Sequence, residues 1–139
     1  MNKIYTLSYP GSIIFGNHCS ELLPEKLKGF SRILLVTGNH FKNSDQYAKI
    51  VDSLADFTLS TISGIHAEVP LEDVDRVVLA AKEFQAQAIV AIGGGSVMDC
   101  AKAAAALAVL DHHQRSAPHR RRGAACQQSA AAQRFQIPF

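Results

Sequence analysis

The feature that most constrains this chain of 139 residues is a continuous apolar run that ends in three consecutive glycines. The run covers residues 88–92, AIVAI, and the glycines follow at 93–95. A second apolar run, residues 33–36, ends just before Thr37 and Gly38. Continuous rather than alternating hydrophobicity is typical of strands buried on both faces, as in a parallel sheet. The two runs therefore predict an α/β fold in which helices cover both faces of a parallel sheet.

Helical periodicity and turn residues place the other elements. We expect helices over residues 19–29, 45–57, 71–86 and 96–110, and strands over 4–7, 12–15 and 58–62. Asp45 is placed to accept hydrogen bonds from the first free amides of the second helix. The third helix follows Pro70, and its first turn carries acidic residues, Asp73 among them, that favour the positive end of the helix dipole. The inward faces of these two helices are expected to contain Tyr47, Ile50, Val51, Leu54 and Phe57, and Val74, Val77, Val78, Ala81 and Phe84.

Composition limits the class of protein. The chain is 47% hydrophobic and 19% charged, a balance typical of globular proteins rather than disordered ones. No run reaches the roughly 18 apolar residues that a membrane helix needs, and the first residues make a poor signal peptide. Cys19, Cys100 and Cys126 are far apart and form no CxxC pair, so reduced thiols are favoured over a zinc site. We therefore expect a cytoplasmic protein without a membrane partner.

The character of the sequence changes at about Leu110. Residues 1–110 contain nine Lys or Arg and eleven Asp or Glu, whereas residues 111–139 contain five Arg, one Asp and no Lys. The second segment has no sustained periodicity, and we expect it to be a disordered tail or foreign to the fold. A shifted reading frame would produce such a change, and a genuine short variant is the alternative. The basic run at residues 119–122 has no aromatic interleaving, so nucleic acid is not a favoured partner.

The segment AIVAIGGGSVMDCAK, residues 88–102, carries the chemistry. Glycines let the backbone approach a ligand closely, and the first turn of the following helix presents free N–H groups at the positive end of its dipole. Such a turn binds a phosphate or pyrophosphate. Ser96 can cap the helix or add a hydroxyl to the phosphates, and Asp99, three residues later, fits a variant of the capping box. The alternative is a glycine turn with a serine cap and no ligand.

GGGSVMDCAK resembles the GGGSxxDxAK motif of the iron-containing alcohol dehydrogenase family. The rest of residues 1–110 supports the resemblance. Residues 12–16 are similar to the family's opening strand, residues 32–37 to its second strand, and residues 64–77, with a proline in the middle, to the stretch before its third helix. The resemblance covers roughly the first third of the family's length. It implies an incomplete Rossmann-like domain over residues 1–110, with the metal-binding helical domain absent.

The resemblance also assigns roles to single residues. Gly94, Gly95 and Ser96 match the backbone that cradles the pyrophosphate of the dinucleotide. Asp99 matches a residue near the ribose and nicotinamide side of the cofactor. Lys102 belongs to the motif, although a solvated helix lysine is an equal alternative. Asp99 and Lys102 together distinguish the pattern from the related maleylacetate reductases.

One departure from the family bears on the choice of cofactor. Many members carry an aspartate after the second strand that bonds the adenosine ribose, whereas this chain has Gly38 followed by Asn39. A carboxylate at that position would repel a 2′-phosphate, and Gly38 removes the repulsion. We therefore expect NAD or NADP as the cofactor, with NADP(H) tolerated or preferred. The alternative is that Gly38 is only the turn after a strand.

The resemblance implies an oxidoreductase that transfers a hydride between NAD(P) and a small alcohol or aldehyde. In the intact family iron or another divalent metal is held by one Asp and three His, and none of those ligands is expected here. His18, His40 and His66 look isolated, and the remaining histidines, 112, 113 and 119, lie in the tail. We therefore assign no catalytic residue and no metal ligand, and expect a truncated, inactive chain. A catalytically dead dinucleotide-binding or subunit-binding module is the alternative, and a homo-oligomer is possible.

Overall fold

The structure is a computed structural model that describes Ile14 and residues 16–116, with residues 109–116 described as backbone. The strand expected over residues 4–7 lies outside the described residues, as do 12, 13 and 15 of the expected strand 12–15. Residues 117–139 of the expected tail also lie outside them.

The centre of the fold is a three-stranded parallel sheet in the order β2-β1-β3. The strands are β1 (Arg32–Thr37), β2 (Thr58–Ile62) and β3 (Ala88–Ile92). β1 lies in the middle, and its last residues pair on both sides: Val36 lies opposite Ile62, and Thr37 lies opposite Ile92. The prediction of a parallel sheet built on the two continuous apolar runs is confirmed.

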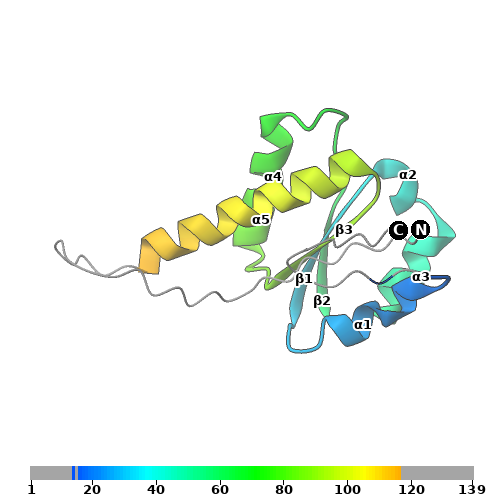
Figure 1. The fold of residues 1–139 in the computed structure, drawn as a ribbon. Helices are drawn as coiled ribbons and strands as arrows, with labels where there is room; N and C mark the ends of the chain where they lie inside the picture. Colours follow the sequence, from blue (N-terminus) through cyan, green and yellow to red (C-terminus); the bar gives the residue numbers. More distant parts are fainter. Residues whose placement is uncertain (1–13, 15, 117–139) are drawn as a thin grey trace, which may run out of the picture.

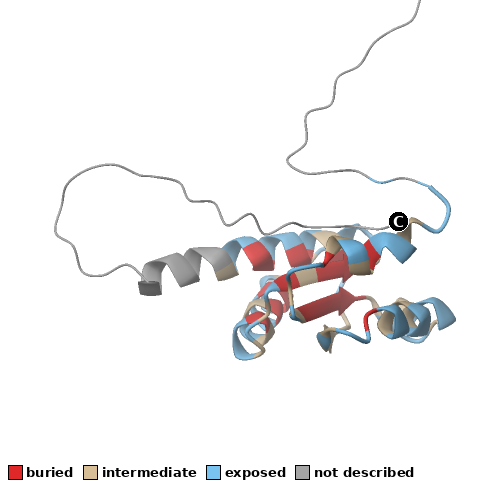
Figure 2. Cartoon of the chain, turned by 90° about the horizontal axis from the view of Figure 1, so that it is seen from below, coloured by how far each residue is buried: buried red, intermediate tan, exposed pale blue. Residues whose placement is uncertain are grey.

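Helices cover both faces of the sheet (Figure 1). A 3₁₀ turn, Cys19–Leu22, is followed by α1 (Leu23–Lys26), α2 (Asn39–Lys42), α3 (Asp45–Ser53), α4 (Leu71–Glu83) and α5 (Gly95–Ser116). Because side chains alternate along a strand, Leu34 and Val36 pack with α4 and α5, whereas Ile33 and Leu35 pack with α1 and α3. Figure 2 shows the buried positions in the strands and on the helix faces turned toward them.

Several helix boundaries differ from the expected ones. The segment expected as one helix over 19–29 is divided, because Pro24 has no N–H to continue the preceding turn and instead opens α1. Ser44, not Asp45, caps α3: its hydroxyl accepts a hydrogen bond from the amide of Tyr47 at 3.2 Å. The expected inward faces are confirmed, with Leu54, Val74, Val77 and Ala81 buried and the other members half-buried.

The last helix, α5, does not end near Leu110 as expected. α5 continues without interruption to Ser116, six residues into the segment expected to be disordered. The physical reason is that residues 103–116 contain neither glycine nor proline, so no helix-breaking residue follows the alanine-rich part of α5 where the charge pattern changes. None of the helices in the described part of the chain is both long and apolar enough to cross a membrane.

The order of the strands creates a switch point. The chain leaves β1 toward β2 on one side and later returns to place β3 on the other side. In open parallel sheets, ligands bind outside the carboxyl ends of the strands at such a reversal. Here the reversal lies between β1 and β3, whose ends are joined by a buried hydrogen bond of 2.8 Å from the Thr37 hydroxyl to the carbonyl oxygen of Ile92.

Candidate functional site

Gly38 and the glycine turn after β3 lie together at this switch point. A Cβ built on Gly38 would lie 3.9 Å from Cγ2 of Val97, in ordinary contact, so Gly38 is next to the first turn of α5. A Cβ built on Gly93 would lie 2.9 Å from the same atom and 3.2 Å from Cβ of Val97. Val97 is buried among other core side chains, and a Cβ at position 93 would be closer to it than real Cβ contacts come. Only glycine therefore lets the chain turn from β3 into α5 at position 93.

Gly94 and Gly95 form the open side of the turn. A Cβ on either residue would meet nothing within 4 Å, so the turn faces free space. The carbonyl oxygen of Gly94 accepts a hydrogen bond from the amide of Met98 at 3.2 Å, which begins the helical pattern. The N–H groups of the first turn of α5 precede that bond and have no acceptor within the helix. They stand at the positive end of a 22-residue helix, where an anionic group is favoured.

Ser96 and Asp99 do not form the expected cap. Ser96 is the second residue of α5, so its half-exposed hydroxyl lies in the first turn rather than at the flanking position. The carboxylate of Asp99 lies 3.7 Å from the ammonium of Lys102, and the two side chains are exposed. A surface pair of this kind contributes little to stability. Asp99 is therefore accessible to a ligand that extends along the exposed side of α5.

Asn39 links the ends of β1 and β2. It follows Gly38, whose backbone is extended, and it begins α2. Gly64 lies just after β2 with a φ of +76°, and a Cβ built there would be 3.5 Å from Oδ1 of Asn39. The Asn39 side chain thus lies against the start of the loop between β2 and α4. The structure brings Gly38, Asn39 and the glycine turn to one edge of the sheet, and Asp99 one turn further along α5.

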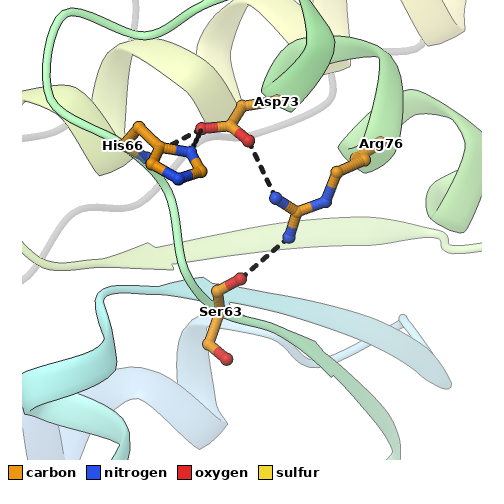
Figure 3. Close-up of polar contacts among 4 residues, drawn as sticks. All are labelled: Ser63, His66, Asp73 and Arg76. Atoms are coloured by element: carbon orange, nitrogen blue, oxygen red, sulfur yellow. Dashed lines mark hydrogen bonds and ion pairs between the residues drawn. The ribbon is translucent and has the colours of Figure 1, made fainter.

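A polar network beside this edge was missed by sequence reasoning (Figure 3). The side chain of Asp73 is only 3% exposed, and its Oδ2 accepts hydrogen bonds from the backbone N–H of His66 at 2.7 Å and from Nδ1 of the same residue at 3.0 Å. Its Oδ1 accepts from Nη1 of Arg76 at 2.8 Å, and Nη2 of Arg76 donates to the carbonyl oxygen of Ser63 at 2.9 Å. The expectation that His66 is isolated is therefore wrong.

The network keeps Asp73 charged. The hydrogen bond from the His66 amide is the largest influence and lowers the pKa of Asp73, while burial opposes it and the His66 ring and Arg76 add to the lowering. A usable signal was present in the sequence, because Asp73 shares the inward stripe of α4 with Val77 at a spacing of four residues. A buried acidic residue needs hydrogen-bonding partners, which the loop before the helix supplies through His66 and the helix itself supplies through Arg76.

Among the side chains that the structure describes, the other titratable groups form no metal centre. His18 lies 3.3 Å from Glu21 in an exposed pair. Burial raises the pKa of the Cys100 thiol, which lies on the face of α5 that packs in the core. Within Ile14 and residues 16–108, whose side chains are described, there is no group of three or more His, Cys, Asp or Glu that could hold a metal ion. His119 lies outside the described residues, and the side chains of residues 112 and 113 are not described.

Comparisons with known proteins identify the family to which the chain is similar. The family model described as iron-containing alcohol dehydrogenase matches residues 10–137. A probable NADH-dependent butanol dehydrogenase 1 of Bacillus subtilis is 34% identical over 111 residues, which cover 77% of this chain and 29% of that protein. Maleylacetate reductase 2 of Cupriavidus pinatubonensis is 29% identical over 107 residues, covering 76% of this chain and 29% of the relative.

A solved structure agrees with the fold. The crystal structure of NADH-dependent butanol dehydrogenase A from Thermotoga maritima superposes with a TM-score of 0.67 and 30% sequence identity. The match covers 75% of this chain and 27% of that one. The chain thus spans less than a third of the length of the relatives it matches.

The buried Asp73 makes stability depend on pH in the acid range. Because its pKa in the folded chain is lowered below the ordinary value of 3.8, its contribution is fully present above that value and is lost as the pH falls through the folded pKa. We expect the difference in unfolding free energy between the unchanged chain and Asp73→Asn, measured with urea, to narrow between pH 5 and about pH 3.

The exposed Asp75 on the same helix supplies the control, and Asp75→Asn should differ little from the unchanged chain across this range. A ¹³C titration of the Asp73 carboxyl in the unchanged chain checks the direction independently of how well the variant folds. A titration midpoint above the ordinary value, or a stability difference that does not change with pH, would contradict the account.

Proposed function

The chain belongs to the iron-containing alcohol dehydrogenase family, and we propose that its described part binds the dinucleotide NAD(P) at the carboxyl edge of the sheet. The observation that carries this proposal is the glycine turn at residues 93–95. It lies at the switch point between β1 and β3, it opens onto free space, and it leads into the positive end of a long helix. Together these features favour the close approach of a pyrophosphate.

The pyrophosphate is assigned to Gly94, Gly95 and Ser96. The two glycines leave room for phosphate oxygens, and the free N–H groups of the first helical turn donate hydrogen bonds to them. The Ser96 hydroxyl, half-exposed in that turn, adds one further donor. Asp99, exposed one turn later, is assigned to the ribose and nicotinamide side. The nicotinamide itself would carry the hydride, and these residues would orient it.

The adenosine end is assigned to Gly38 and Asn39. The curated relative in Bacillus subtilis and the Thermotoga maritima structure are named for NADH. On this chain no carboxylate follows β1, so nothing at Gly38 repels a 2′-phosphate. We propose that NAD(H) and NADP(H) are both accepted, with the 2′-phosphate tolerated because the position lacks the negative charge.

The reaction proposed for the whole protein is hydride transfer between the dinucleotide and a small alcohol or aldehyde. In such an enzyme a divalent metal polarises the oxygen of the alcohol or aldehyde. The described residues do not fit that group, because they contain no cluster of three or more metal-ligating side chains. We therefore assign no catalytic residue to the described part of the chain.

A dinucleotide-binding or subunit-binding module without catalytic activity remains the second candidate, favoured by the lack of a metal cluster among the described residues. An assay of NADH formation from a small primary alcohol with added Fe²⁺ separates the candidates. Turnover that depends on the metal would show that this chain is itself an enzyme. Binding of NADH without turnover would support the module.

Ser96→Asp tests the pyrophosphate assignment. A carboxylate in the first turn of α5 is favourable to the helix dipole but repels the phosphates. We expect the affinity for NADH, measured by calorimetry, to fall about tenfold or more, while the thermal midpoint stays the same or rises. Ser96→Ala, which removes only the hydroxyl, should lose much less affinity. Equal affinity of Ser96→Asp and the unchanged chain would refute the assignment.

Gly38→Asp tests the choice of cofactor. The backbone at Gly38 is extended and a Cβ there makes only ordinary contact with Val97, so an aspartate fits without strain. We expect the ratio of NADPH to NADH affinity to fall about tenfold because the new carboxylate repels the 2′-phosphate. Gly38→Ala adds the same Cβ without charge and should leave the ratio unchanged. If the unchanged chain already binds NADH at least tenfold more tightly than NADPH, the proposal that both cofactors are accepted is overturned.

A further inference from the structure

We propose that Arg76, held by the buried carboxylate of Asp73, is a positioning residue that fixes the Ser63–Gly64 corner against Asn39 at the adenosine end of the site. This inference rests on the proposed function, because Asn39 matters here as a contact of the dinucleotide. It goes beyond that function by assigning a role to a side chain on α4 that is not among the residues assigned to the dinucleotide.

Hydrogen bonds connect the buried carboxylate to Ser63, and Asn39 lies beside the next residue, Gly64. Nη1 of Arg76 donates to Asp73 and Nη2 donates to the carbonyl oxygen of Ser63 (Figure 3). The hydroxyl of Ser63 accepts from the ammonium of Lys42 at 3.4 Å, which ties the corner to α2. Gly64 follows, and a Cβ on it would lie 3.5 Å from Oδ1 of Asn39. Arg76 therefore holds the Ser63–Gly64 backbone beside which the Asn39 side chain lies.

The loop needs such a restraint. Three of its residues have a left-handed backbone: Gly64 with φ +76°, Glu68 with φ +63° and Val69 with φ +44°. For a β-branched residue such as Val69 this conformation is costly and persists only where the surroundings enforce it. The two oxygens of Asp73 supply that enforcement at two points. Oδ2 holds the middle of the loop at His66, and Oδ1 holds its start through Arg76.

The geometry needs a guanidinium rather than a simple positive charge. One nitrogen of Arg76 bonds the carboxylate and another bonds a main-chain carbonyl, so a single planar fork spans two acceptors on different elements. A lysine ammonium can neutralise Asp73, but its compact head cannot keep both bonds in this geometry. Arg76→Lys therefore separates charge from position: the buried carboxylate remains paired, and the link to Ser63 is lost.

Arg32 provides a matched control at the opposite edge of the sheet. Its Nε donates to the carbonyl oxygen of Gln85 at 3.0 Å, so it also ties a loop carbonyl through a guanidinium. That bond lies at the start of β1, away from the carboxyl edge. Arg32→Lys thus removes the same kind of contact without touching the proposed site, and any general effect of losing a guanidinium appears in both variants.

The experiment measures the affinity of the full chain for NADH, ADP-ribose and inorganic pyrophosphate by calorimetry. In Arg76→Lys we expect affinity for NADH and ADP-ribose to fall about tenfold, the scale of one net hydrogen bond to a charged group, with pyrophosphate unchanged. Arg32→Lys should bind all three like the unchanged chain. A merely structural role for Arg76 would instead weaken all three ligands together or none of them.

The outcomes separate this inference from the proposed function. If the unchanged chain binds NADH and the two lysine variants bind it equally well, the positioning role is overturned and the function stands. If the unchanged chain does not bind NADH, the proposed function fails, and amide hydrogen exchange at Asn39 and Gly64 decides the positioning role. Faster exchange there in Arg76→Lys than in Arg32→Lys supports it, and equal exchange refutes it.

Discussion

The structure depends on the central strand β1, which is paired on both edges and covered on both faces. Its residues from Ile33 to Thr37 have no exposed surface. Burial of this extent places apolar side chains out of water on two faces at once and satisfies the backbone through the neighbouring strands. Because β2 and β3 both run parallel to β1, all three carboxyl ends meet at one edge. The candidate site exists because of that convergence.

The close approach of Val97 to Gly93 places the start of α5 beside the carboxyl ends of the strands. α5 can begin directly above the end of β1 only because position 93 has no Cβ to meet Val97. The same packing brings Gly38 beside the first turn of α5 and aims the free amides of that turn toward the switch point. A core contact between a glycine and a valine thus orients the groups assigned to the pyrophosphate.

The parts of the fold set by burial could be predicted from the sequence. The runs at residues 33–36 and 88–92 are apolar without interruption, so strand type and location followed from them. Boundaries were less predictable where competing local groups decide them. Ser44 and Asp45 are both good caps, and only the three-dimensional path of the chain selects Ser44. The predicted end of the last helix at Leu110 was wrong, because a change in charge pattern does not by itself end a helix and α5 continues to Ser116.

Some residues of the candidate site could be predicted from the sequence, and others could not. Glycines in a turn have a local meaning, so positions 38 and 93–95 were identified from sequence and lie together in the structure. The network around Asp73 joins residues from a loop and a helix through a buried carboxylate, and its geometry depends on left-handed residues that have no sequence signature. The sequence marks Asp73 as an acidic residue in an apolar stripe, but the partners of its carboxylate are identified only from the structure.

The measurement that tests the central claim most directly is a titration of the ¹⁵N-labelled chain with NADH, followed by amide chemical shifts. The account predicts that the largest shifts occur at residues 38–39 and 94–96, at the carboxyl edge of the sheet. Residues at the opposite edge, such as Arg32 and Gln87, should hardly move. Shifts centred on that opposite edge, or no saturable change at millimolar NADH, would contradict the claim that this edge binds a dinucleotide.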